Sequence, residues 1–373
     1  MFTPAPDPAP DPAPGPGPGP VPAAMPLTAS APAPASGPTL ADVARAAEVS
    51  TATVSHALNG TGRLGESTRR RVREVAGVLG YGARRGPNTR SIGIAVTTYA
   101  GFAWDFAEIA YYSRLLVAAT SAAHAHGYAL TTLPADRGAD PLWHTLAVDG
   151  MLLLDSPADD PVLRALRARG LPVVFDGPPV DPRPGDVWVD NDHTAAAREV
   201  LDHLEASGAR RIALHAAFGR ESYTEAVTTA YEHWCAERGR APLVIPFDPD
   251  DAAGRAFDSA FAGPERPDAV YCVYDPGGRQ VLAAAARHGI RIPGVRGGPG
   301  EDGLLVVCAS EDPSYAENEP SVTTVTFHPE RIARAAVSSL VKLIESGHAE
   351  SPGRLTVPTA LRVRTSSRPP RMY

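Results

Sequence analysis

Three short stretches between residues 39 and 81 repeat apolar residues at helical spacing and are separated by polar breaks. The first stretch contains Leu40, Val43, Ala44 and Ala47. The second covers residues 51–58 and directs Val54 and Leu58 inward, and Ser50 is placed to accept from its first free N–H groups. The third begins at Ser67 and contains Val72, Val75, Ala76 and Leu79 before Gly80 ends it. The pattern predicts three short helices around one shared core.

From Ile92 onward the pattern changes to short apolar runs that alternate with amphipathic stretches of helical length. Runs such as 92–96, 150–154, 172–175, 211–214, 269–273 and 304–307 have the length and composition of buried strands. The intervening stretches, such as 193–207, 221–238 and 330–346, have helical periodicity. This alternation predicts an α/β body of parallel sheets covered by helices on both faces.

The first 38 residues differ in composition from the rest of the chain. Fourteen of them are Pro, and none is Lys or Arg. Such a segment buries too little apolar surface to offset the entropy of ordering it, so a disordered tail is expected for residues 1–38. It also lacks the basic start and unbroken apolar run of a secretory signal.

Charge separates the helical segment from the body. Residues 39–90 hold nine Arg and four acidic residues, a balance of +5. The whole chain carries −7, which leaves −12 on the remainder. A basic head on an acidic body favours a head that contacts nucleic-acid phosphate.

These residues resemble the lactose-repressor (LacI/GalR) family of transcription regulators. The resemblance is carried by T-L-x-D-V-A from Thr39, V-S-x-x-T-V-S from Val49, L-N-G from Leu58, T-R-x-x-V from Thr68 and L-G-Y from Leu79. It implies that the second helix enters the major groove of DNA, where Thr51, Ala52 and His56 contact base edges. It also implies phosphate contacts from Thr39, Ser50, Thr53, Asn59, Thr68 and Tyr81. Ser55 on the outward face and the nearby Arg63 complete the expected contact set within the head.

Two residues of the head depart from the family's usual pattern. His56 stands where the family commonly has Arg, and a His cannot hydrogen-bond guanine O6 and N7 bidentately. We therefore expect contacts to thymine methyl groups and one His hydrogen bond. Glu48 stands where the family often has Gly in the turn, and a left-handed conformation there would cost roughly 1 kcal/mol.

The linker after Tyr81 departs further. Residues 82–91 contain Gly86-Pro87 and no leucine, which argues against the family's usual hinge helix and its minor-groove wedge. Arg84 and Arg85 are expected to contact phosphate or lie in the minor groove. The alternative is a plain solvated linker that happens to be basic.

The resemblance extends over the body, through F-A-W-D-F-A-E-I-A from Phe102, V-D-G-M-L-L-L from Val148, G-L-P-V-V-F-D from Gly170, V-D-N-D from Val189 and P-S-V-T-T-V from Pro320. It implies a periplasmic-binding-protein-like core of two doubly wound subdomains. The implied domains are a helix-turn-helix head (39–81), a linker (82–91), a core (92–366) and a tail (367–373). Within the core, the first subdomain takes about 92–189 and 327–350, and the second takes about 190–326 and 351–366.

Ligands of doubly wound sheets bind beyond the carboxyl ends of the strands, so the residues at those ends are the effector-site candidates. The candidates are Tyr99, Phe102, Trp104, Asp155, Asp176, Arg220, Tyr223, Tyr274, Asp275, Ser310, Glu311 and Phe327. Aromatic rings beside carboxylates suit a sugar or nucleoside, although each ring could equally be core packing. Val227 falls near the position where the family often has a ligand-clamping Arg, which weakens the case for ordinary hexose recognition.

The sequence thus predicts a transcriptional repressor that binds a pseudo-palindromic double-stranded DNA operator as a homodimer, with a tetramer as the alternative. A small polar effector is expected to modulate it. The competing hypotheses are a ligand-binding protein with a degenerate head, and an enzyme on the same scaffold. The enzyme hypothesis is disfavoured because the usual nucleophile, phosphate-loop, dinucleotide and zinc motifs are absent from the sequence.

No cofactor, metal site or catalytic residue is predicted. The contiguous Asp190-Asn191-Asp192-His193 is better explained as a helix start than as a metal site. The three cysteines are far apart and are expected to be reduced. Since no run of about 18 apolar residues occurs, no membrane association is expected, and a cytoplasmic, nucleoid-associated protein is predicted.

Overall fold

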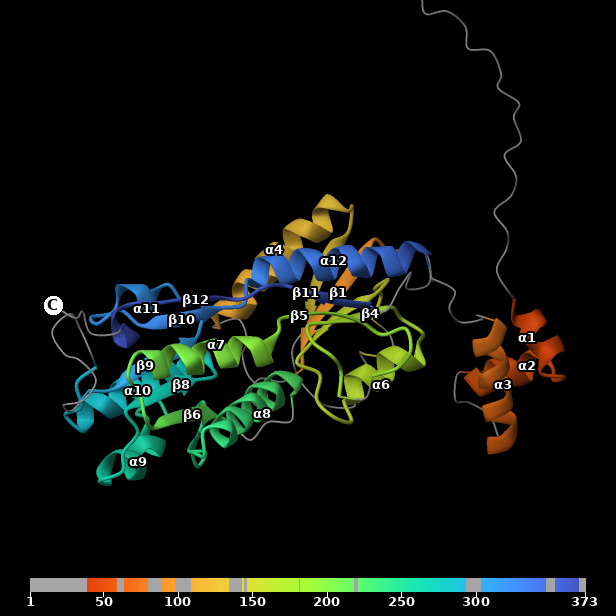
Figure 1. Ribbon diagram of the computed structural model, residues 1–373. Coiled ribbons are helices and arrows are strands. Elements are labelled where there is room, and N and C mark those ends of the chain that lie inside the picture. Colours follow the sequence, from red (N-terminus) through yellow and green to blue (C-terminus); the bar gives the residue numbers. More distant parts are fainter. Residues whose placement is uncertain are drawn as a thin grey trace, which may run out of the picture. The chain divides into compact units, whose positions relative to one another are not determined.

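The computed structural model describes residues 39–58, 64–79, 89–97, 109–133, 143, 146–180, 182–217, 221–292, 303–346 and 353–368. The chain divides into a helical N-terminal unit and a larger α/β unit, which we describe separately (Figure 1). No helix in these ranges is long and apolar enough to cross a membrane.

The N-terminal helices are α1 (Leu40–Ala46), α2 (Thr51–Leu58) and α3 (Glu66–Leu79). They match the three predicted helices to within a residue at the described ends. Side-chain caps fix two of the starts, because Thr39 forms a capping box with Asp42 and the Ser50 hydroxyl accepts from the backbone N–H of Thr53 at 3.0 Å. The buried side chains are Val43, Ala44, Ala47, Val54, Ala57, Val72 and Ala76.

The turn between α1 and α2 has the predicted left-handed residue. Glu48 has φ of 52° and is exposed, and the backbone N–H of the next residue, Val49, bonds back to the Ala44 carbonyl at 3.0 Å. Only a left-handed residue lets the chain reverse this tightly after the helix, and a side chain is strained there.

The larger unit contains two six-stranded sheets. The first has the order β11-β5-β4-β3-β1-β2, and every pairing in it is parallel. Its strands are β1 (Ser91–Val96), β2 (Ala129–Leu133), β3 (Met151–Leu154), β4 (Val173–Phe175), β5 (Val187–Asp190) and β11 (Gly353–Thr356). Its helices are α4 (Ala110–Ala125), α6 (Pro161–Ala168) and α12 (Pro329–Ser346).

The second sheet has the order β12-β10-β9-β8-β6-β7 and is parallel except for β12, which runs antiparallel to β10. Its strands are β6 (Ile212–Ala216), β7 (Val244–Pro246), β8 (Ala269–Cys272), β9 (Leu305–Ala309), β10 (Thr323–Thr326) and β12 (Ala360–Arg362). Its helices are α7 (His193–Ala206), α8 (Ser222–Glu237), α9 (Asp258–Ala262), α10 (Asp275–Arg287) and α11 (Ser314–Glu317), with 3₁₀ turns η2 (Arg255–Phe257) and η3 (Thr365–Ser367).

Both faces of each sheet are apolar, as expected for sheets covered on both sides. In β1 and β3, Ile94 and Leu152 pack with α4 and α12, whereas Ala95 and Leu153 pack with α6. Figure 1 shows α12 lying along α4 and α8 lying along α7, and both helix pairs are in contact. Cys235, Cys272 and Cys308 are buried free thiols within this packing.

The chain passes between the sheets three times, after β5, after β10 and after β11. The subdomain boundaries inferred from the sequence need one correction. Residues 353–356 were placed in the second subdomain, but β11 pairs with β5 in the first sheet over Gly353–Thr356. The last crossing therefore lies between β11 and β12.

Candidate functional site

A pocket lies at the carboxyl ends of strands from both sheets. It is lined from the first sheet by residues that follow β3, β4 and β5, and from the second by residues that follow β8, β9 and β10. Its volume is about 730 Å³, including the space at its mouth. This location is typical of small-molecule sites in doubly wound folds.

Eight of the twelve effector-site candidates line this pocket, although they are spread over some 170 residues of sequence. They are Asp155, Asp176, Tyr223, Tyr274, Asp275, Ser310, Glu311 and Phe327. The other four, Tyr99, Phe102, Trp104 and Arg220, lie outside the described residues. Val227 is buried in α8 and does not line the pocket.

The sequence analysis missed the remaining lining residues, which are Ile109, Tyr111, Tyr112, Asn191, His193, Glu221, Thr224, Val273 and Ala309. Asn191 and His193 could have been found, because they follow β5 directly and the strand-end rule applies to them as to the others. Tyr111 and Tyr112 lie on α4, and only tertiary packing brings this helix to the pocket.

Aromatic rings form one wall of the pocket. The His193 ring lies 4.6 Å from the Tyr223 ring and 5.3 Å from the Phe327 ring, centroid to centroid. Tyr223 also packs edge-on against Tyr274 at 6.2 Å, and Phe327 against Tyr111 at 6.5 Å. The edge-to-face geometry keeps these rings in contact with one another, so they form a continuous apolar surface inside a polar cleft.

Two carboxylates of the first sheet are coupled through the backbone. Asp155 ends β3 with φ of 48°, and its N–H donates to the Asp176 carboxylate at 2.9 Å. The Tyr112 hydroxyl donates to the Asp155 carboxylate. Burial, with a further contribution from the nearby Asp190 carboxylate, raises the pKa of Asp176 to about 7.

The start of α7 carries the next polar group. Asp192 caps the helix by accepting from the N–H of Ala195 at 2.9 Å, as predicted for a helix start. Asp190 lies 3.0 Å from His193 Nε2, and its Oδ1 also accepts from the N–H of Asn191. These contacts orient the His193 ring toward the aromatic wall.

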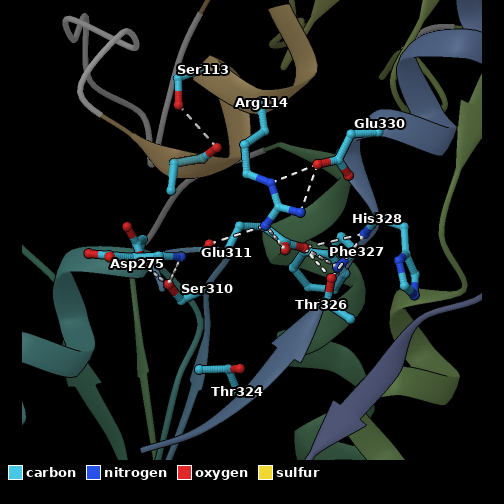
Figure 2. Close-up of polar contacts among 12 residues, drawn as sticks. Ser113, Arg114, Asp275, Ser310, Glu311, Thr324, Thr326, Phe327, His328 and Glu330 are labelled. Carbon is cyan, nitrogen blue, oxygen red and sulfur yellow. Dashed lines mark hydrogen bonds and ion pairs between the residues drawn. The ribbon is translucent and has the colours of Figure 1, made fainter. Parts of the chain in front are cut away.

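The second sheet contributes Asp275 and Ser310. Asp275 is the first residue of α10, and the Ser310 hydroxyl donates to its carboxylate (Figure 2). Burial raises the pKa of Asp275 to about 6, although the hydrogen bond from Ser310 opposes the shift. The carboxyl is thus held at the pocket wall in an apolar setting.

Glu311 occupies the centre of a network that joins the two sheets. Its carboxylate accepts from the N–H of Phe327 at 2.8 Å, from the Thr326 hydroxyl and from Arg114 Nη1 at 2.7 Å. Figure 2 shows Arg114 reaching from α4 between Glu311 and Glu330, and its Nε donates to Glu330 at 2.7 Å. This cluster ties α4 of the first sheet to the segment after β9 of the second.

The exposed face of α2 carries the predicted base-contacting residues. Thr51, Ala52 and His56 are exposed, and Thr53 and Ser55 are half-buried. Ser50 and Thr39 are exposed and engaged as helix caps, and Thr68 is half-buried on α3. Asn59, Arg63, Tyr81, Arg84 and Arg85 lie outside the described residues, as does most of the predicted linker.

Comparison with known proteins finds one family match in each of the two units. Residues 39–83 match the model of bacterial regulatory proteins of the lacI family, and residues 201–367 match the periplasmic binding protein-like domain. The chain thus carries a lacI-family DNA-binding domain followed by a periplasmic binding protein-like domain. These two matches agree with the order of elements in both units.

Named relatives of this chain are transcriptional regulators. It is 29% identical to the HTH-type transcriptional regulator CelR of Thermobifida fusca, covering 88% of this chain and 98% of the relative. It is 25% identical to the HTH-type transcriptional repressor PurR of Glaesserella parasuis, covering 87% and 94%.

Solved structures show the same fold. The CelR–cellobiose complex matches with a TM-score of 0.64 at 27% identity, over 88% of this chain and 99% of that one. The lac repressor dimer bound to operator matches with a TM-score of 0.62 at 20% identity, over 89% and 99%. The second match is evidence for the fold alone.

Proposed function

We propose that this chain is a DNA-binding transcriptional repressor whose operator binding responds to a small polar effector. The observation that carries the proposal is the combination in one chain of a LacI-family head and a body with a pocket between two doubly wound sheets. The named relatives are themselves HTH-type regulators and repressors, which supports the proposal. An enzymatic role is not part of it.

The head binds an operator through the exposed face of α2. Thr51 and Ala52 are small and suit thymine methyl groups, while His56 supplies one hydrogen bond to a base edge. Ser50, Thr53 and Thr68, with Thr39 at the start of α1, contact phosphates. Because each base contact is modest, a homodimer on a pseudo-palindromic operator supplies specificity through half-site spacing. The protein acts in the cytoplasm, on nucleoid DNA.

The pocket binds the effector between the two sheets. Carboxylates accept from hydroxyl groups, and the rings of Tyr223 and Phe327 cover apolar faces of a sugar or nucleoside. The relative solved with cellobiose supports a sugar-like molecule. An effector that binds one arrangement of the two subdomains more tightly shifts the population, and with it the presentation of the heads.

A mobility-shift titration tests the DNA-binding part of the proposal. Full-length protein is titrated on fragments of its own promoter region at several salt concentrations, and log affinity is expected to fall linearly with log salt. His56→Ala should weaken binding about three- to tenfold, the value of one hydrogen bond. The control is His233→Ala, which removes an exposed His from α8 of the body and should leave affinity unchanged.

The competing hypothesis, a ligand-binding protein with a degenerate head, makes the opposite prediction. It expects no retardation of any promoter fragment at low salt, and equal behaviour of the His56 and His233 variants. That result would refute the repressor assignment while leaving ligand binding by the body open to direct measurement.

A further inference from the structure

We propose that the effector carries a positive charge: the pocket is built for an amine-bearing, hydroxyl-rich small molecule of the amino-sugar type. This proposal rests on the proposed function of the pocket as the effector site. It adds the charge of the ligand, which neither the family match nor the fold specifies.

The described lining of the pocket is rich in acidic side chains, and His193 is its only basic residue. Its described lining contains five carboxylate side chains and neither Arg nor Lys. They are Asp155, Asp176, Glu221, Asp275 and Glu311. The Arg114 guanidinium balances Glu311 at 2.7 Å from outside the lining. A phosphate or carboxylate ligand would therefore meet like charges and find no Arg or Lys among the described lining residues.

Asp176 and Asp275 have no counter-ion among the described residues. Neither forms an ion pair with any residue that the structure describes, and their hydrogen bonds come from the Asp155 N–H and the Ser310 hydroxyl. Arg279 of the same helix is paired with Asp312, and its charge lowers the pKa of Asp275 without forming an ion pair with it. Buried anions without a counter-ion are costly, so these two carboxyls favour a ligand that brings one.

The two carboxyls come from opposite subdomains. Asp176 follows β4 of the first sheet and Asp275 begins α10 after β8 of the second sheet. Raised pKa values of about 7 and about 6 are the expected response of carboxyls held in this setting, and a cation would restore the ionised form. An effector with two amines could thus interact with both subdomains.

The aromatic wall accommodates the same ligand. The rings of Tyr111, Tyr223, Tyr274 and Phe327 line the pocket beside these carboxylates. Ring faces attract ammonium groups and also stack on the C–H faces of sugars. A pocket that joins uncompensated carboxylates to several rings suits a cationic sugar better than it suits a neutral one.

A set of three disaccharides isolates the charge. Cellobiose, N,N′-diacetylchitobiose and the β-1,4 disaccharide of glucosamine share one backbone and differ at C2, where they carry hydroxyl, acetamide and ammonium groups. Each is titrated by calorimetry into the full-length protein at slightly acidic to neutral pH, where the sugar amines keep their protons and a bound ammonium group favours ionisation of the carboxyls. The diamine should bind at least tenfold more tightly than cellobiose, and only its affinity should fall with added salt.

Variants assign the preference to the two carboxyls. Asp176→Asn and Asp275→Asn should each reduce the diamine-to-cellobiose affinity ratio severalfold, because the amide removes the charge that only the diamine uses. Glu232→Gln removes an exposed charge from α8 away from the pocket and should leave the ratio unchanged. Far-UV circular dichroism and melting curves establish whether each variant is folded. If one of the two pocket variants does not fold, the affinity ratio of the other one alone tests the proposal.

The proposal would be overturned if a neutral disaccharide bound as tightly as the diamine or more tightly, or if none of the three bound. It would also be overturned if the diamine-to-cellobiose affinity ratio were unchanged in both pocket variants. Promoter binding by the same preparation distinguishes the possible failures. Retarded DNA without an amine preference refutes only the charge of the effector, whereas the absence of retardation concerns the repressor assignment itself.

Discussion

Replacing Arg114 by Met is expected to destabilise the body far more than the same change at a surface arginine. Arg114 forms an ion pair with Glu311, whose side chain is 1% exposed, and with Glu330. Arg198 makes a bidentate pair with Glu237, whose side chain is 49% exposed. Both arginine side chains are 38% exposed, so the comparison isolates the burial of the carboxylate partner.

The expected loss of unfolding free energy depends on which partners Glu311 retains. In Arg114→Met, Glu311 keeps the Phe327 N–H and the Thr326 hydroxyl but loses its only ion-pair partner among the described residues. Breaking a fully buried pair costs about 3–5 kcal/mol, and losing one hydrogen bond to a charged group costs about 1.5–3 kcal/mol. Since water can partly replace the half-exposed guanidinium, we expect about 2 kcal/mol.

Urea unfolding of the full-length protein, followed by far-UV circular dichroism, measures the loss of unfolding free energy in Arg114→Met. In a separate thermal melt, the midpoint temperature of this variant should fall by about 4 °C. Arg198→Met should change stability much less, because solvent screens both members of the Arg198–Glu237 pair. Adding Glu311→Gln to Arg114→Met should recover stability by removing the stranded charge. Equal losses for the two arginine variants, or a further loss on adding Glu311→Gln, would refute the reasoning.

Three further predictions follow from individual residues. Glu48→Gly should stabilise the head by about 1 kcal/mol, because glycine adopts the left-handed backbone at this position without strain. Amide hydrogen exchange in α1 and α2 should slow accordingly. The control is Ala46→Gly in the exposed last turn of α1, which should destabilise the head by about 1 kcal/mol. Asp176 has a pKa of about 7 in the folded chain and 3.8 as its ordinary value, so its contribution to stability is full below about pH 4 and is lost as pH rises through 7. Asp176→Asn should therefore be more stable than wild type at pH 8, by at most about 4 kcal/mol. In melting experiments the gap should narrow at pH 5 and close below about pH 4, and a pH-independent gap would contradict this. Gly254→Ala should unfold at lower urea concentration than Gly239→Ala, because both have left-handed backbones but a Cβ at Gly254 would overlap a backbone carbonyl of α10 while one at Gly239 meets open space.

Hydrophobic periodicity was sufficient to locate the elements that bury a whole face. The predicted helix 193–207 corresponds to α7 at His193–Ala206, and the run 150–154 corresponds to β3 at Met151–Leu154. Burial of these stretches is nearly continuous along one face or both, so the sequence pattern and the structural cause coincide.

The elements that escaped prediction are stabilised by tertiary context. Residues 353–356 form β11 although three of the four are exposed, because β5 supplies the hydrogen-bonding edge. The start of α10 is not evident from the sequence, because Asp275-Pro276-Gly277-Gly278 has the composition of a turn. Pro276 lies in the first turn of the helix, where proline is tolerated. Gly278 packs closely against the Tyr315 ring, and a Cβ at this position would clash with that ring.

The strand-end rule located eight pocket residues because parallel strands bring their carboxyl ends to one edge. It could not locate the Arg114–Glu311–Glu330 cluster, whose members lie on a helix, a strand end and a second helix far apart in sequence. Nor could it find that Asp176 and Asp275 form no ion pair within the described part of the chain, because ion pairing depends on which side chains tertiary packing places nearby.

The late crossing between β11 and β12 also bears on how the protein is made. The strands at one edge of each sheet, β11 and β12, are both supplied by residues 353–362, after every other strand has been synthesised. Neither sheet can be completed on the ribosome until this segment emerges, so the folding of both subdomains depends on the same few residues. A message truncated before codon 353 would leave β5 and β10 as bare edges, open to pairing with other chains, and its product would be a substrate for quality-control proteolysis.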